Sequence, residues 1–183
     1  MAQRQVAKSD EWYTPAYAVE PIIPYLKKYS TVWCPFDLPE SNYVKCLKEK
    51  GFKVIHSHIS EGADFFEQEV PECDYIVSNP PYSLKDDILE RLIAIGKPFA
   101  MLLNVSGLFD SKKRFELLKD NPIEILYMYP RVDFFNFDRR GEKSSPTYQS
   151  SYVCKNILPT QIAAAKINKQ NQEPTSSANE VSH

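Results

Sequence analysis

Short apolar runs alternate with helix-like segments over roughly the first 120 residues, and this alternation restricts the fold more than any other feature. Apolar runs of this length are typical of strands buried on both faces, whereas apolar residues three and four positions apart indicate helices. Strands are predicted at residues 31–36, 52–59, 74–78, 99–103, 123–129 and 149–154, and helices at 15–29, 41–50, 86–95 and 112–119.

Strands that alternate with helices form a mostly parallel sheet, because right-handed crossover connections place helices on both of its faces. The sequence therefore predicts an α/β fold of that kind. We expect one domain over residues 1–159, in which the aperiodic stretch 130–150 is a candidate substrate-contacting loop. Residues 160–183 are poor in large apolar side chains, so we expect a disordered tail there, with at most a frayed helix at 162–169.

The composition is that of an ordinary globular protein. It argues against several classes of site and partner and favours none. The formal net charge of −2 gives no overall attraction to nucleic acid, so any phosphate contact must come from a local basic patch. The four cysteines form no CxxC pair, which argues against a metal site and against a disulfide framework. Since no apolar stretch has membrane-spanning length, we expect a cytoplasmic protein without membrane contact. No pattern indicates the oligomeric state.

Asn79-Pro80-Pro81-Tyr82 directly follows a predicted buried strand and is the most informative motif. The two prolines fix φ and carry no backbone N–H, so the turn is stiff and its carbonyl oxygens stay available as acceptors. Ligands of parallel sheets bind beyond the carboxyl ends of the strands, and Asp37 also follows such an end. We therefore expect Asn79 and Asp37 to belong to one site.

The motif suits a planar ring that carries an NH2 group. The side-chain oxygen of Asn79 and the carbonyl of Pro80 can each accept one N–H hydrogen bond from the amine, and Tyr82 can stack on the ring. Accepting both hydrogen bonds draws the nitrogen towards tetrahedral geometry and frees its lone pair to attack a methyl sulfonium. The motif thus predicts methylation of an amino nitrogen without a metal, and its catalytic residues are Asn79, Pro80, Pro81 and Tyr82.

At this motif the chain resembles the amino-methyltransferases, whose signature is Asp/Asn/Ser-Pro-Pro-Tyr/Phe after a core strand. Residues 10–15 look like the N-terminal cofactor motif of adenine methyltransferases, and residues 34–37 take the place of the family's Asp-Pro-Phe motif. The resemblance covers roughly residues 10–105 and points to S-adenosylmethionine-dependent N6-adenine DNA methyltransferases of the small phage or EcoRI-like type. It implies a Rossmann-like methyltransferase fold, S-adenosylmethionine as cofactor and DNA as partner.

The resemblance also implies roles for individual residues. It assigns cofactor binding to Trp12, Tyr13, Thr14, Pro15, Pro35, Phe36, Asp37, His58, Asp64 and Phe65. Beyond the motif, aromatic, polar and basic side chains are the candidate substrate contacts, namely Tyr82, Ser83, Arg131, Arg139 and Arg140. Two alternatives stay open at this stage. Asp64 can instead cap a short helix, and residues 133–137 can be a core strand rather than part of a substrate loop.

The chain departs from the family pattern at two places. No glycine-rich loop follows Phe36, and the second predicted strand ends in His56-Ser57-His58 where the family carries an acid for the ribose hydroxyls. Adenine N6 in DNA is the favoured substrate because residues 10–15 resemble the motif of DNA enzymes. The alternatives are RNA adenine, the amide of a protein glutamine, and an inactive methyltransferase-fold protein that acts as a binding or inhibitor module.

Overall fold

The computed structural model describes residues 13–135, 143–144 and 149–169, and its centre is a seven-stranded sheet. The strand order is β2-β1-β3-β4-β8-β5-β9. The strands are β1 (Thr31–Cys34), β2 (Lys53–His56), β3 (Tyr75–Ser78), β4 (Phe99–Asn104), β5 (Glu124–Tyr129), β8 (Ser150–Lys155) and β9 (Ile162–Lys166).

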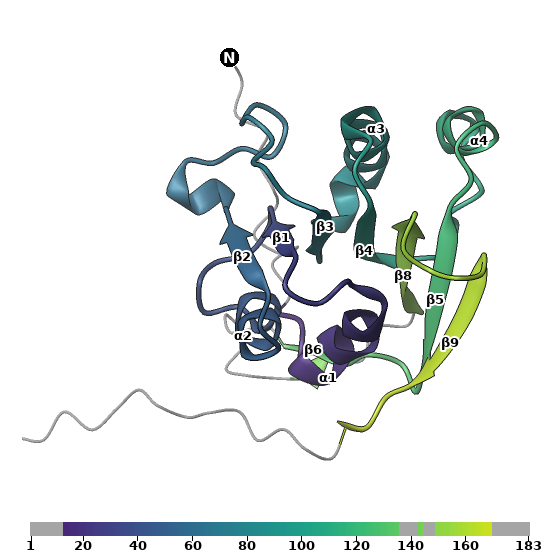
Figure 1. Cartoon of the computed structure of the whole chain (residues 1–183). Coiled ribbons are helices and arrows are strands. Elements are labelled where there is room, and N and C mark those ends of the chain that lie inside the picture. The colour runs from purple at the N-terminus through teal and green to yellow at the C-terminus, as the bar shows by residue number, and fades with distance from the viewer. Residues whose placement is uncertain (1–12, 136–142, 145–148, 170–183) are drawn as a thin grey trace, which may run out of the picture.

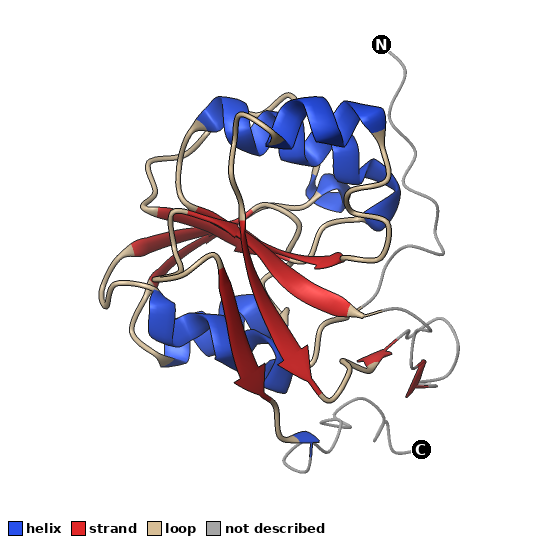
Figure 2. Cartoon of the chain, turned by 90° about the vertical axis from the view of Figure 1, so that its right-hand side faces the viewer, coloured by secondary structure: helices blue, strands red, loops and turns tan. Residues whose placement is uncertain are grey.

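Helices cover both faces of this sheet (Figures 1 and 2). One layer contains α1 (Ala16–Val19), the 3₁₀ helix η2 (Glu20–Tyr25) and α2 (Asn42–Glu49), and the other contains α3 (Lys85–Ile95) and α4 (Lys112–Leu118). Two short 3₁₀ turns, η3 (Ile59–Glu61) and η4 (Tyr82–Leu84), follow β2 and β3. None of the described helices is long and apolar enough to cross a membrane.

The sheet is parallel except for one strand. β2, β1, β3 and β4 pair in parallel, whereas β8 runs antiparallel to both of its neighbours, β4 and β5. As a result, β5 and β9 point the same way as the first four strands. A mostly parallel sheet with helices on both faces is the Rossmann-like fold that the sequence predicts, and this prediction is confirmed.

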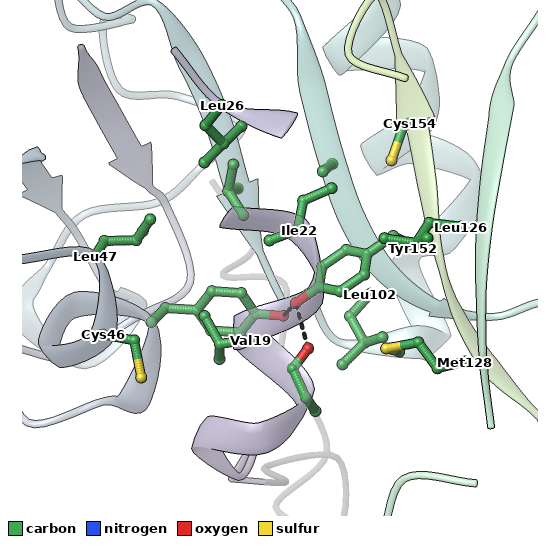
Figure 3. Packing of buried hydrophobic residues seen from close by; sticks show 14 of the residues in the cluster. Val19, Ile22, Leu26, Cys46, Leu47, Leu102, Leu126, Met128, Tyr152 and Cys154 are labelled. Atoms are coloured by element: carbon green, nitrogen blue, oxygen red, sulfur yellow. Dashed lines mark hydrogen bonds between the residues drawn. The ribbon is translucent and has the colours of Figure 1, made fainter. Parts of the chain in front are cut away.

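The two faces of the sheet carry separate apolar clusters. On the α1 and α2 side the largest buried side chains include Tyr43 and Tyr152, and on the α3 and α4 side they include Trp33 and Phe99. The hydroxyls of Tyr43 and Tyr152 are 2.9 Å apart, and that of Tyr152 donates to the carbonyl of Ala18 at 2.9 Å (Figure 3). These bonds remove the cost of burying two hydroxyl groups in an apolar cluster.

Local signals set the predicted helix ends. Ser41 accepts a hydrogen bond from the backbone N–H of Val44 at 3.2 Å and so begins α2. Gly96 ends α3 with a φ of 74°, a left-handed conformation that glycine adopts without a Cβ clash. The predicted helix at residues 15–29 divides into α1 and η2 and ends at Tyr25, because Pro21 and Pro24 lack the N–H that a continuous helix needs.

The C-terminal part of the described chain corrects one prediction. Residues 162–166, expected as a frayed helix or tail, form the edge strand β9 in parallel register with residues 125–129 of β5. The alanines there favour a helix in isolation, but the open edge of β5 supplies backbone partners that outweigh this propensity. Residues 170–183 lie outside the described part.

The start of the predicted substrate loop also packs against the core. The Tyr17 hydroxyl donates to the carbonyl of Asp133 at 3.2 Å and accepts from its N–H at 3.0 Å. Phe134 is buried, and with Phe135 it forms β6 (Phe134–Phe135), which pairs with β7 (Lys143–Ser144). Of the two alternatives for residues 133–137, the core strand therefore holds for Phe134.

Candidate active site

Asp37 lies just beyond the carboxyl end of β1 and joins three elements. Its backbone N–H donates to the carbonyl of Ser57, which follows β2, at 3.1 Å. Its carboxylate accepts hydrogen bonds from the hydroxyl of Ser78, the last residue of β3, and from that of Ser41 at the start of α2. We call Asp37, Ser41 and Ser78 the acid cluster.

Burial sets the electrostatics of the acid cluster. Asp37 is only 7% exposed, and the loss of water around its carboxylate raises its pKa to about 6. The hydrogen bonds from Ser78 and Ser41 stabilise the charged form and oppose this rise. A carboxylate that burial makes costly is typical of a functional site, where a positively charged or hydrogen-bonding ligand can complete its surroundings.

The predicted catalytic motif continues directly from Ser78. Asn79 is half-buried with its Oδ1 atom shielded from solvent, and Pro80 is buried. Tyr82 begins η4, and its hydroxyl lies 3.2 Å from the Oγ atom of Ser150 in β8. The motif is therefore held between β3 and α3 and is tied to a second strand, and a substrate amine reaches Oδ1 only when the groups that cover it move.

The N-terminal segment approaches the same edge of the sheet. The carbonyl of Thr14 accepts a hydrogen bond from Nδ2 of Asn42, the residue after Ser41, at 2.9 Å. Thr14 and Pro15 are buried, whereas Tyr13 is exposed. The structure thus brings Thr14 to Asn42, the chain neighbour of Ser41 in the acid cluster. Trp12, predicted with Thr14, lies outside the described residues.

In the segment after β2, the predicted cofactor residues His58 and Asp64 form hydrogen bonds with their own chain neighbours. His58 caps η3, and its Nδ1 atom lies 2.7 Å from the Oγ atom of Ser60. The Oδ1 atom of Asp64 accepts from the N–H of Phe66 at 2.9 Å, so Asp64 begins a turn at residues 65–67 and not the short helix that the sequence left open. The polar side chains of this segment are thus engaged in local turns.

Phe65 belongs to the core rather than to an open surface. Its side chain is 3% exposed, with ring centroids 4.8 Å from Phe36 and 5.7 Å from Trp33, and the guanidinium of Arg91 lies 5.3 Å from the ring. A ring enclosed in this way presents no face to a ligand. Of this aromatic group, Phe36 is only half-buried and lies one residue before Asp37.

The candidate substrate residues are only partly described. Ser83 and Arg131 are exposed, while Arg139 and Arg140 lie outside the described residues. The basic run at residues 112–114 is largely engaged within the chain, because Arg114 pairs with Asp86 and Lys113 contacts Asp87 at 2.8 Å. This run therefore offers less free positive charge than its sequence suggests.

Several residues of the site were not predicted. Ser78 was predicted only as the end of a strand and Ser41 only as the start of a helix, and their contact with Asp37 depends on how the strands pair. Asn42 and Ser150 carried no signal in the sequence. A serine hydroxyl in a strand or at a helix start becomes a candidate site residue only when the fold places a buried acid beside it.

Two further observations bear on ligands. A cavity of about 330 Å³ lies at the amino ends of the parallel strands, opposite the carboxyl ends that carry the acid cluster. It is lined by Lys27, Lys28, Tyr29, Ser30, Asp74, Tyr75, Pro98 and Asn156. It is therefore separate from the acid cluster. Within the described part of the chain, no group of three or more His, Cys, Asp or Glu residues is placed to hold a metal ion.

Known proteins resemble this chain both in sequence and in structure. Over 90 residues the chain is 33% identical to the type II methyltransferase M.EcoRI of Escherichia coli, and this match covers 44% of the chain and 27% of that protein. The chain thus matches little more than a quarter of that relative's length. No protein-family model matches the chain.

Both structural matches have 14% sequence identity. A type I restriction-modification methyltransferase subunit from Streptococcus thermophilus has a TM-score of 0.45, and the match covers 85% of this chain and 47% of that one. A dimethyladenosine transferase from Plasmodium falciparum has a TM-score of 0.46, with 79% and 62% covered.

Proposed function

We propose that this chain, a relative of the adenine DNA methyltransferases, transfers a methyl group from S-adenosylmethionine to an exocyclic amino nitrogen, with adenine N6 in DNA as the substrate. The contact between Asp37 and Ser78 carries this proposal. It joins the predicted cofactor loop to the residue before Asn79, so a methyl donor held at Asp37 lies next to the acceptors of the motif.

The residues around Asp37 suit the charge of the cofactor. S-adenosylmethionine carries an ammonium group and a sulfonium, and it supplies an electrophilic methyl carbon when it is bound. Asp37 offers a desolvated carboxylate to the positive charge, and buried Thr14 is hydrogen-bonded to Asn42, next to Ser41. Phe36 supplies a half-buried aromatic surface beside them.

Asn79 and Pro80 act on the acceptor amine. The side-chain oxygen of Asn79 and the backbone carbonyl of Pro80 each accept one N–H hydrogen bond from the amine. These bonds localise the lone pair of the nitrogen and direct this lone pair at the methyl carbon. Asp37 would hold the methyl donor, which would supply its methyl carbon to this nitrogen and keep the electrons of the broken carbon–sulfur bond on sulfur, while the nitrogen would lose one proton to solvent. Tyr82, tethered through Ser150, holds the plane of the ring. The reaction needs no covalent enzyme intermediate and no metal.

A second candidate function is a methyltransferase-fold binding protein without cofactor. It is favoured by two observations, the shielded Oδ1 atom of Asn79 and the enclosed ring of Phe65. The loop after Phe36 also lacks the glycines that let a backbone approach the cofactor. In this function the motif would contact a macromolecule without transferring a methyl group.

Tritium transfer from labelled S-adenosylmethionine to DNA, RNA or protein distinguishes these functions. We expect transfer to DNA and a loss of about 100-fold or more in rate for Asn79→Ala, since one transition-state acceptor is removed. Asn121→Ala is the matched control, because Asn121 donates to the carbonyl of Leu117 at the end of α4, in a helix that lies apart from the motif. Full activity in Asn79→Ala contradicts the catalytic role, and the absence of transfer to any substrate favours the binding protein.

A further inference from the structure

Two exposed tyrosines lie near the end of β5. Tyr127 is 48% exposed and Tyr129 is 72% exposed, although both belong to a strand whose other face is buried. They alternate with the core residues Leu126 and Met128, so both rings project from the same face of the sheet. Large exposed aromatic groups that share one face indicate a binding surface more often than isolated ones do.

The pairing of the strands places these tyrosines at the edge that carries the catalytic motif. Leu103 of β4 pairs with Ser151 of β8, and Ser151 pairs with Tyr127. Leu103 is the second-to-last residue of β4, so Tyr127 lies level with the carboxyl end of β4. Because β8 is antiparallel to both β4 and β5, these two strands run in the same direction. Tyr129 therefore extends beyond Tyr127 towards the same edge of the sheet as Asn79.

The separation matches a short length of nucleic acid strand. From β3 to β5 the sheet crosses β4 and β8, three strand spacings or about 14 Å. Stacked nucleotides rise about 3.4 Å along one strand, so about four of them cover this distance. A strand with its target base at Asn79 therefore reaches Tyr127 with bases a few positions away.

Two described basic residues accompany the tyrosines, one on the neighbouring strand and one in the chain after β5. Lys166 of β9 is the register partner of Tyr129, and both are exposed. Arg131 is exposed two residues further along the chain. Among the described residues that follow β5, Asp133 is paired with Lys169 at 2.7 Å. Aromatic rings beside cations suit bases and phosphates, whereas the net charge of −2 gives the whole chain no such preference.

We propose that Tyr127 and Tyr129, with Lys166 and Arg131, form a stacking surface for the nucleic acid strand that flanks the target base. This inference rests on the proposed function for the identity of the substrate, but not on catalysis. The bases stack on the tyrosine rings, and the phosphates contact Lys166 and Arg131. β9, which carries Lys166, is the edge strand of the sheet and lies beside β5, which carries the tyrosines (Figure 1).

Fluorescence anisotropy with a labelled single-stranded oligonucleotide of about 16 nucleotides, at low salt and without cofactor, tests the surface. We expect the double variant Tyr127→Ala/Tyr129→Ala to bind at least about tenfold more weakly than the unchanged chain, since stacking is lost. Tyr127→Phe/Tyr129→Phe keeps both rings and should bind within about twofold. Lys166→Gln should reduce the salt dependence by about one phosphate contact.

Tyr29→Ala is the matched control, because Tyr29 is 80% exposed and lines the cavity at the amino ends of the parallel strands. It should leave the affinity unchanged. Equal affinities for the alanine double variant and the unchanged chain would overturn the inference, as would no binding by the unchanged chain. A change of oligomeric state in sedimentation without a change in affinity would also overturn it and identify a protein interface.

The two proposals fail separately. If the alanine double variant binds DNA weakly but the unchanged chain transfers no methyl group, the stacking surface stands and the proposed function fails. If the chain methylates DNA and the alanine double variant binds as well as the unchanged chain, the stacking surface alone fails.

Discussion

The predicted cofactor residues fall into two regions that fold in opposite ways. Around Asp37 the chain buries a carboxylate at an energetic cost and surrounds it with hydroxyl groups from β3 and α2. After β2 the chain buries the ring of Phe65 at an energetic gain and engages Asp64 in a turn. Packing explains the burial of Phe65, whereas the buried carboxylate of Asp37 gains nothing from apolar packing and is the better candidate for a ligand contact. We therefore expect substitutions to affect stability in the second region and ligand binding in the first.

The largest effect on stability should come from Phe65→Ala. The ring is enclosed by Trp33, Phe36 and Arg91, so its removal leaves a cavity and should lower the free energy of unfolding by about 3–5 kcal/mol. Urea unfolding measures the change. Phe36→Ala is the control, because the Phe36 ring is half-buried and its loss should cost less. A loss below about 1 kcal/mol for Phe65→Ala would show that this ring is not a core residue.

Asp37→Asn should change stability in the other direction and should do so only at higher pH. The folded-state pKa of about 6 exceeds the ordinary value of 3.8, so the folded chain loses stability as pH rises through this window. Below pH 3.8 both states are protonated, and above about pH 6 the penalty is complete. A shift of about two pKa units corresponds to roughly 3 kcal/mol, so asparagine should stabilise the chain by up to that amount at pH 8.

Thermal or urea unfolding of Asp37→Asn at pH 4 and pH 8 separates this penalty from other effects of the substitution. The gain should be present at pH 8 and nearly absent at pH 4. If Asp37→Asn instead lowers the stability equally at both pH values, the Asp37 side chain stabilises the fold through its hydrogen bonds. That outcome would contradict the burial penalty and with it the argument for a ligand at Asp37.

The smallest effect should follow Asp64→Ala. This change removes one capping hydrogen bond to Phe66 and should cost about 1 kcal/mol. Asp64→Asn keeps an acceptor oxygen and should recover most of that loss in the same unfolding measurement. If Asp64→Ala lowers cofactor affinity about tenfold, the turn after β2 belongs to the ligand site after all.

Patterns that are local in sequence predicted most of the fold. Apolar runs and helix caps located the strands and helices, and the rule for carboxyl ends of parallel strands placed Asp37 and Asn79 at one edge. The sequence failed where an outcome depends on a distant partner. Residues 162–166 joined the sheet because β5 offered an open edge.

The sequence also failed to predict parts of the site because they depend on partners that are distant in the chain. The hydrogen bond from Ser78 to Asp37 links residues 41 positions apart, and only the order of β1 and β3 brings them together. The family resemblance assigned Phe65 to the cofactor, but its surroundings come from Trp33 and Arg91 on other elements.

Titration calorimetry with S-adenosylhomocysteine tests the central claim most directly, using the unchanged chain, Asp37→Asn and Asp64→Ala. We predict that the unchanged chain binds, that Asp37→Asn weakens binding at least about tenfold by removing a charge-assisted hydrogen bond, and that Asp64→Ala binds within about threefold of the unchanged chain. Equal affinities for the unchanged chain and Asp37→Asn, or no binding at millimolar ligand, would contradict the assignment of the acid cluster to the cofactor.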